Sequence, residues 1–446
     1  MHQSQKPSGT PRPWSRQIQA RYECQLSDDL IAWFDDAAWQ LADGQSSGEF
    51  CFAVPPEQLL CDAPPAIWPA LMPCDFLPVL GNDMGDWLCI RVGDDGSTDQ
   101  IIHWYHGGGD WIPWGNSLSQ AILFDQVRGR LPGSRGHAVA PLKTESTSDP
   151  AGGDRRLAEW AIGRLSATTR TAAKAVATLQ ELSGYELANA LLEQHWCEPA
   201  VRCQMIIDAL ANRWLTPEQI QSWQLDDADQ VQQWLFDNRR IAPERLSQIA
   251  SQHGISVDQL LADQSWADVA MHCRHVVQSA PELSWGYELL GYSHEREGEI
   301  EQAIELYRRG LNCSVFTDQT VRVRTHGFDA GGQKFSATRL QAIGYRPAGE
   351  FEREYLQRLG FDDTDRRREA VQSFFSDLAA EAERQGDPGR AHRLWCRAGW
   401  DLGAEPMTAF AELLSRTTAA AKDAGRPAMG AVAATHRECF RQRYGL

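Results

Sequence analysis

About a third of the way along its 446 residues the sequence changes character, and the change limits the folds open to it. Residues 21–131 are rich in tryptophan and broken by glycine and proline, whereas residues 156–446 carry apolar residues at helical spacing. Residues 132–155 between them are dominated by proline, glycine, serine and threonine. The sequence therefore predicts an α+β domain, a linker and an all-α domain over these three ranges, after a disordered N-terminus at residues 1–20.

Short strands separated by tight turns are predicted between Leu77 and Trp114. The turn at Gly81-Asn82-Asp83 separates two predicted strands, and in the second of them Trp87, Cys89 and Arg91 alternate with Leu88, Ile90 and Val92. Two more strands are expected at residues 101–105 and 111–114, and Asn116-Ser117-Leu118 opens a helix. We expect an antiparallel sheet closed by this helix, with earlier helices around residues 30–41 packed on it.

The same region resembles the SUKH superfamily over the stretch LPVLGNDMGDWLCIRV and the later stretch IIHWYHGGGDWIPWGNSLSQAIL. The matching residues are Pro78, Gly85-Asp86-Trp87-Leu88, His103-Trp104 and Asn116-Ser117-Leu118. The resemblance implies an α+β fold with a binding role. Many bacterial members look like immunity proteins, which neutralise toxins by direct contact, so it also implies a protein partner.

Charge separates the two parts of the chain. Residues 21–131 hold 17 acidic and 4 basic side chains, a formal charge of −13 out of −17 for the whole chain. This balance argues against nucleic acid as a partner, because phosphate contacts need clustered lysine and arginine. The acidic surface serves either solubility alone or attraction of a basic protein partner, such as a basic toxin.

The remaining composition predicts a cytoplasmic protein. No apolar stretch approaches the length of a membrane span, and no export signal is recognisable at the N-terminus. The eleven cysteines are scattered, and no two are separated by only two residues. We therefore expect reduced, packed thiols with no disulfide framework, no metal site and no cofactor.

Acidic turns and the glycine loop His106–Gly109 are expected to project from the sheet, and binding residues concentrate on such turns. Tryptophan flanked by charge is typical of binding hot spots. The predicted partner-binding residues are Asp83, Asp86, Trp104, His106, Asp110 and Trp111.

An enzyme is the alternative, with a site among Asp83, Asp86, His103, His106 and Asp110. The His106-Gly107-Gly108-Gly109 run is typical of the oxyanion loop of some hydrolases, but no G-x-S-x-G motif follows it. Convergence of the carboxylates and imidazoles in a deep pocket would favour chemistry, and scattered exposed groups would favour binding.

The helical half resembles tetratricopeptide (TPR) repeats near residues 267–314 and 372–403. The residues that carry the match are Tyr287, Leu290, Gly291, Ala303, Tyr307 and Gly310 in the first unit, and Phe375, Leu378, Ala379, Gly386, Ala391, Trp395 and Ala398 in the second. An insertion at about residues 316–370 separates them and contains a basic patch of Arg322, Arg324, Lys334, Arg339 and Arg346. Together these patterns predict a non-enzymatic protein-binding protein, either an immunity protein or a regulatory scaffold, of open oligomeric state.

Overall fold

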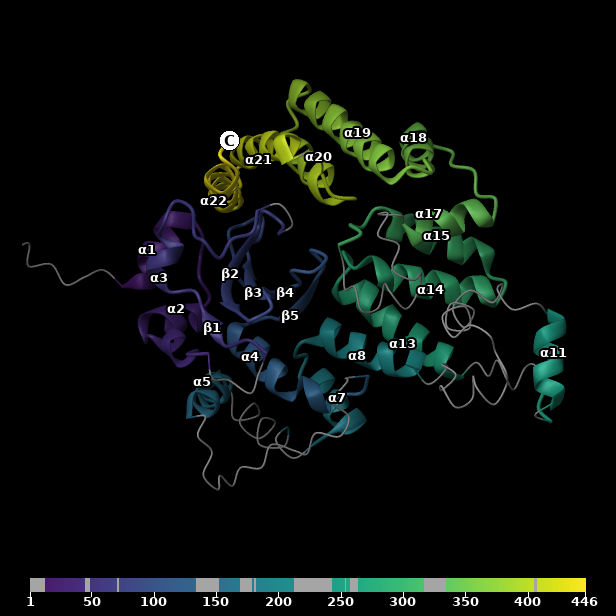
Figure 1. The fold of residues 1–446 in the computed structure, drawn as a ribbon, viewed down its shortest axis with the longest axis horizontal. Helices are drawn as coiled ribbons and strands as arrows, with labels where there is room; N and C mark the ends of the chain where they lie inside the picture. Colours follow the sequence, from purple (N-terminus) through teal and green to yellow (C-terminus); the bar gives the residue numbers. More distant parts are fainter. Residues whose placement is uncertain are drawn as a thin grey trace, which may run out of the picture.

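The computed structural model describes residues 13–44, 49–69, 72–133, 152–168, 179, 182–211, 243–252, 254–256, 264–316, 334–404 and 407–446 (Figure 1). The N-terminal part consists of a small sheet with short helices. Its elements are α1 (Trp14–Tyr22), α2 (Asp28–Asp35), η1 (Ala38–Leu41), β1 (Phe52–Ala53), α3 (Pro56–Leu59), β2 (Phe76–Gly81), β3 (Trp87–Arg91), β4 (Gln100–Trp104), β5 (Trp111–Gly115), α4 (Leu118–Val127) and η2 (Arg128–Arg130).

The sheet is an antiparallel meander in which the strands follow one another in the order β1-β2-β3-β4-β5. This arrangement confirms the predicted antiparallel sheet and its order of strands and turns. The Ser117 hydroxyl accepts a hydrogen bond from the Gln120 amide at 3.2 Å, so it caps α4 as the sequence predicts. The prediction of a disordered N-terminus is wrong for residues 14–20, which lie in α1 with Ile18 fully buried.

Every described element after η2 is a helix, so the α+β part is followed by a helical part. The helices are α5 (Gly152–Thr168), α7 (Gly184–Glu193), α8 (Glu198–Ala211), α11 (Pro243–Gln252), α13 (Gln264–Ser279), α14 (Ser284–Arg296), α15 (Ile300–Leu311), α17 (Phe335–Ala342), α18 (Glu350–Leu359), α19 (Thr364–Arg384), α20 (Pro388–Trp400), α21 (Met407–Asp423) and α22 (Pro427–Tyr444). No helix in the described ranges is long and apolar enough to cross a bilayer.

Three helix pairs share one kind of turn. Gly298 joins α14 to α15, Gly386 joins α19 to α20, and Gly425 joins α21 to α22, each with a φ between 70° and 80°. This left-handed conformation suits glycine because a Cβ atom would strain it. Within the first pair Tyr307 packs directly over Gly291, where an added Cβ would lie 2.7 Å from the ring.

The sheet is covered on both faces. All residues of β2 and β5 are buried, and so are Leu88, Cys89 and Ile90, which alternate between the faces of β3. An antiparallel sheet with one face in water would show exposed residues at every second position. The short N-terminal helices are joined by helices from the second half of the chain in forming this cover (Figure 1).

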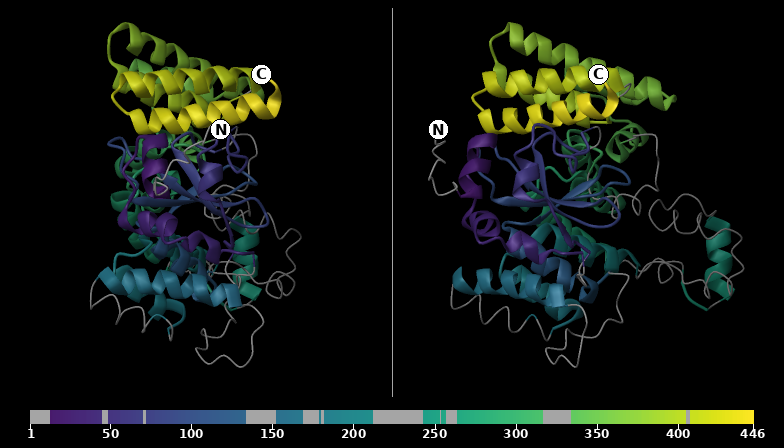
Figure 2. Two further views of the ribbon diagram at one scale, coloured as in Figure 1. Left: turned by 90° about the vertical axis from the view of Figure 1, so that its left-hand side faces the viewer. Right: turned by 60° about the vertical axis from the view of Figure 1, so that its left-hand side comes forward.

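The C-terminal helices form one of these contacts. His436 of α22 hydrogen-bonds through Nε2 to the carbonyl oxygen of Phe76 at 3.0 Å, and Cys439 lies 3.4 Å from the Pro64 carbonyl oxygen. Arg21 of α1 donates to the Thr435 hydroxyl at 3.2 Å. Figure 2 shows α21 and α22 lying across the sheet-bearing part, beside α1.

Two further contacts join the halves. At the start of the helical part the Gly133 amide donates to Asp208 of α8 at 3.2 Å, and α8 packs on β5. Midway along it, Arg91 of β3 donates to Asp75 at 3.2 Å and to Glu282, just before α14, at 3.0 Å. One continuous cluster of buried apolar side chains therefore runs from α1 to α22. The domain boundaries stay a prediction, and most of the expected linker, residues 134–151, lies outside the described residues.

The predicted basic patch in the insertion does not form as expected. Lys334 and Arg339 are buried, and they pair with Asp401 at 2.9 Å and with Glu295, respectively. Arg322 and Arg324 lie outside the described residues, and Arg346 is exposed. The two buried cations hold α17 against its neighbours because each finds an internal carboxylate.

Acidification should weaken the packing of α22 on the sheet. Burial lowers the pKa of His436 to about 4, whereas an unfolded histidine titrates near about 6.5. Below about pH 6.5 the unfolded chain binds the proton and the folded chain does not, so stability is lost as the pH falls towards 4. We expect His436 to cost about 1 kcal/mol between pH 7.5 and 5.5 in urea unfolding.

His436→Gln is the matched variant, because its side-chain amide can donate to Phe76 without titrating. It should flatten this part of the pH dependence. An identical loss of stability in wild type and variant would show that His436 does not carry it.

Candidate functional site

Two turns meet at one end of the sheet. Gly81, Trp87, Trp104 and Trp111 are partners in register across β2, β3, β4 and β5, so the turns that follow β2 and β4 leave the sheet at the same edge. The Trp87 ring lies over Gly81, where an added Cβ would come within 2.6 Å of it. The partner-binding residues predicted from the sequence lie at this end of the sheet.

The β2–β3 turn is held by the Asn82 side chain. Its Oδ1 accepts from the Met84 and Asp86 amides at 3.0 and 2.8 Å. Its Nδ2 donates to Glu49 at 2.9 Å and to the Asp86 carboxylate at 3.2 Å. An asparagine that satisfies its own turn in this way fixes the backbone. The turn therefore presents Asp83 and Met84 outward, and Met84 is 68% exposed.

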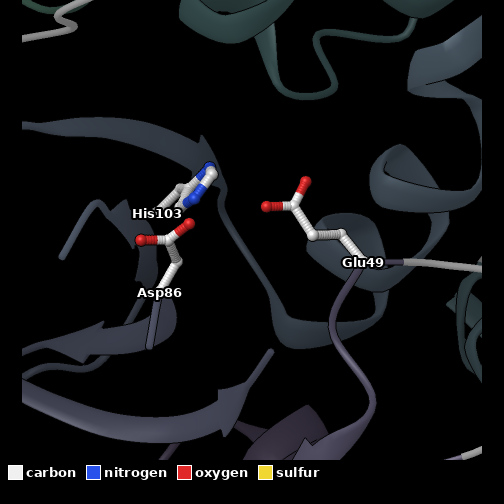
Figure 3. A group of neighbouring side chains, drawn as sticks. All are labelled: Glu49, Asp86 and His103. Carbon is white, nitrogen blue, oxygen red and sulfur yellow. The ribbon is translucent and has the colours of Figure 1, made fainter. Parts of the chain in front are cut away.

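Beneath this turn three chemically active side chains converge (Figure 3). Glu49, Asp86 and His103 each bring a ligand-type atom within 4.8 Å of the other two. Asp86 also accepts a hydrogen bond from the His106 amide at 2.6 Å, which ties the β2–β3 turn to the β4–β5 turn. His103 is fully buried, and neither of its ring nitrogens has a hydrogen-bond partner among the described residues.

Aromatic rings enclose His103. It stacks on Tyr105 with centroids 3.9 Å apart, and it meets Phe50 and Trp114 edge-on at 4.9 and 4.6 Å. Burial, together with the positive charge of Arg128, holds the pKa of His103 well below its usual range. The imidazole is therefore neutral at physiological pH, the form in which histidine binds metal ions.

Arg128 and Asp125 complete the cluster. Arg128 forms an ion pair with Glu49 and lies over the Trp114 ring at 5.5 Å. Burial raises the pKa of Asp125 to about 6, against the opposing attraction of Arg128. The donors are thus one neutral imidazole and two carboxylates, a set that suits a divalent cation, with one arginine already compensating Glu49.

The six predicted binding residues divide into two groups. Asp83 is exposed, and Asp86 and His106 are half-buried at the edge of the sheet. Trp104 and Asp110 are fully buried and Trp111 is 6% exposed, so these three do not present their side chains to solvent.

Alternation explains the burial of the tryptophans. Trp104 and Trp111 stand on the opposite face of the sheet from His103, towards the C-terminal helices. Trp104 meets the ring of His106 at 6.2 Å, His106 meets Trp68 at 5.5 Å, and Arg443 of α22 lies 4.3 Å from the Trp68 ring centre.

The structure brings together only part of the alternative, enzymatic site of five residues. Asp86 and His103 converge, Asp83 points outward, and Asp110 is buried separately in the β4–β5 turn. Sequence reasoning missed Glu49, Asn82 and Arg128. Arg128 carried a usable signal, because a rare arginine in so acidic a region is expected to pair with a carboxylate. Nothing in the sequence places Glu49 beside the strands.

Comparisons with known proteins found no match for the chain. No protein-family model matches the chain, and no curated protein and no solved structure matches it either. The SUKH and TPR resemblances therefore stay predictions.

Replacing Asn82 should loosen the turn. Asn82→Ala leaves the Met84 and Asp86 amides without their acceptor, and we expect a loss of roughly 1–3 kcal/mol in urea unfolding. Asp83→Ala is the control, because an exposed side chain usually changes stability by about 0.5 kcal/mol or less. Equal effects of the two substitutions would mean that Asn82 does not organise the turn.

Proposed function

We propose that this chain is a non-enzymatic protein-binding protein whose acidic sheet domain docks a basic protein partner at the β2–β3 turn. A basic toxin neutralised by direct contact is the partner class that the SUKH resemblance favours. The regulatory-scaffold role is the other form of the same proposal, and both need the same surface.

The observation that carries the proposal is an asymmetry of exposure. Of the 17 acidic residues between positions 21 and 131, 11 are exposed, whereas none of the 4 arginines is. The exposed acids are Glu23, Asp28, Asp35, Asp36, Asp43, Glu57, Asp62, Asp83, Asp94, Asp95 and Asp99. The arginines are drawn into internal contacts, such as Arg91 with Asp75 and Arg130 with the Leu182 carbonyl oxygen at 2.6 Å. Residues 21–131 therefore present exposed carboxylates and no exposed arginine, and Arg16 of α1 is the exposed cation just before them. This excess of negative charge favours a basic partner.

Not every exposed acid is equally available. Arg156 lies 3.2 Å from Asp43, and Arg426 of the helical part pairs with Asp94. Among the described residues no basic side chain forms an ion pair with Asp83, which sits beside the exposed Met84. An apolar side chain on a fixed turn, next to an available carboxylate, is a suitable anchor for a partner because little entropy is lost on binding.

The helical part fits the same proposal. We interpret α14 with α15 and α19 with α20 as TPR-like units, because several of the small and aromatic residues that carry the match are buried in each pair, while Gly386 lies exposed in the turn between α19 and α20. Ala303 and Tyr307 are fully buried in the first pair, and Ala379 and Ala391 in the second. Such arrays are interaction scaffolds, so the helical part would support the sheet domain or add a second contact surface.

Two substitutions at the turn should weaken partner binding. With a partner captured from the native cell and purified, Asp83→Asn with Met84→Ser should slow association several-fold at low salt and flatten its salt dependence. Losing the anchor should weaken the equilibrium affinity by roughly tenfold. Association rates measured at 50 and 300 mM salt test both effects.

Asp99→Asn is the matched control, because Asp99 is an exposed acid in the β3–β4 turn at the opposite end of the sheet. A partner that is acidic, or an association rate that ignores the turn variants, would overturn the proposed surface.

A second candidate, an enzyme with its site at this end of the sheet, is favoured by the convergence of Glu49, Asp86 and His103. Buried imidazole nitrogens without partners are costly, and a bound divalent cation would satisfy one of them. Calorimetric titration with Mn²⁺ and Zn²⁺ tests it. One bound cation, lost in Asp86→Asn, would favour an enzyme, and no binding would leave the cluster as internal polar packing.

A further inference from the structure

Two cysteines far apart in the sequence meet where the C-terminal helices reach the sheet. Cys74 lies just before β2 and is 5% exposed, and Cys396 lies in α20 and is half-buried. Both belong to one apolar cluster with Trp400, Phe410 and Phe440, and the Cys74 thiol donates a hydrogen bond to the Cys396 sulfur.

His392 approaches the same sulfur from one helical turn earlier. Its Nε2 is 3.7 Å from the Cys396 sulfur, and its Nδ1 is 2.8 Å from Nη1 of Arg426. A guanidinium can only donate, so Nδ1 is the acceptor and carries no proton. The proton of the imidazole is therefore on Nε2, where it is directed at the sulfur. Cys396 thus receives one hydrogen bond from an imidazole and one from a thiol, and both stabilise its thiolate.

The surroundings distinguish Cys396 from other thiols of the chain. The hydrogen bonds from Cys74 and His392 lower the pKa of Cys396 to about 6, although burial and the nearby Asp75 oppose this. Burial raises the pKa of Cys24 to about 11 and that of Cys439 to about 12. A thiolate at neutral pH is the form that attacks an oxidant, and a neighbouring thiol is what resolves the product.

We propose that Cys396 and Cys74 form a peroxide-reactive dithiol, in which Cys396 attacks and Cys74 resolves, and that their disulfide ties α20 to the start of β2. The Cys396 thiolate attacks one oxygen of hydrogen peroxide, so that an S–O bond forms and the O–O bond breaks. The leaving hydroxide takes a proton and departs as water. The Cys74 sulfur then attacks the sulfenic acid, the S–O bond breaks, and a second water leaves. Two thiols and one hydrogen peroxide thus give one disulfide and two waters.

The role of His392 in this scheme is positioning. Its Nε2–H holds the negative charge on the sulfur, and Arg426 fixes the tautomer that makes this possible. The disulfide would fasten the C-terminal helices to the sheet at the interface that His436 and Cys439 also form. Oxidation therefore acts on the contact between the two halves of the chain rather than on the acidic turn.

The test treats the intact protein with one equivalent of hydrogen peroxide, blocks the remaining thiols by alkylation, and maps the unreduced peptides by mass spectrometry. We expect a peptide pair linked through Cys74 and Cys396, a loss of two free thiols, and reversal by dithiothreitol. At pH 7, Cys396 should react about tenfold faster than an exposed thiol of ordinary pKa.

Three variants separate the roles. Cys74→Ser should stop at a sulfenic acid on Cys396 that dimedone traps, and Cys396→Ser should abolish both products. Cys61→Ser is the matched control, because Cys61 is exposed and outside this cluster, and it should behave as wild type. His392→Phe should slow the reaction at pH 7 and restore most of its rate at pH 9.

Two results would overturn the proposal. One is oxidation at Cys61 with Cys74 and Cys396 still free. The other is a mapped disulfide that joins different cysteines. Circular dichroism of each variant, compared with wild type before treatment, shows whether a missing product reflects misfolding, and a folded Cys74→Ser variant that gives no sulfenic acid also counts against the proposal.

Discussion

Burial of the sheet on both faces is the constraint on which the arrangement of the chain depends. Apolar side chains of β3 point both ways, and Leu88, Cys89 and Ile90 are all removed from water. One layer of helices can cover one face only, so a second layer is required. The helical half supplies it through α8 beside β5 and through the contact of α22 with the residues around β2. All strands of the sheet come from the first 131 residues. Residues beyond position 400 help to cover it.

Internal ion pairs determine which charged side chains remain at the surface. Arg91 bridges Asp75 and Glu282, so a single guanidinium joins the sheet to the helical half. Arg128 is held by Glu49 and by the ring of Trp114. Buried or half-buried guanidinium groups need such partners, because an unpaired charge in the interior is costly. The arginines of residues 21–131 form contacts inside the protein. Most of the carboxylates that they do not neutralise lie at the surface, so the acidic face follows from the packing.

Local signals predicted much of the sheet. Alternating residues predicted the strands around β3, and the Gly81-Asn82-Asp83 run predicted the turn before it. Ser117 predicted the start of α4. Each of these features depends on nearby residues alone. The helix at residues 14–20 was missed because its burial depends on contacts with distant segments, such as Tyr22 with the Leu59 carbonyl oxygen at 2.7 Å.

The candidate site was predicted less well, for a related reason. Trp104, Asp110 and Trp111 look like projecting residues when only the turns are considered, but all three are buried in the folded chain. Glu49 reaches Asp86 and His103 through tertiary packing that no local pattern encodes. Cys74 and Cys396 meet for the same reason, so a scan for closely spaced cysteines could not find them.

The dependence of the sheet on the helical half can be measured directly with a fragment of residues 13–133. If the helical half is the second layer of the sheet, the isolated fragment exposes an apolar face, and its β2–β5 amides should exchange with solvent within seconds. It should also unfold in urea without a cooperative transition. A fragment that unfolds cooperatively and protects those amides as well as the full chain does would contradict the account.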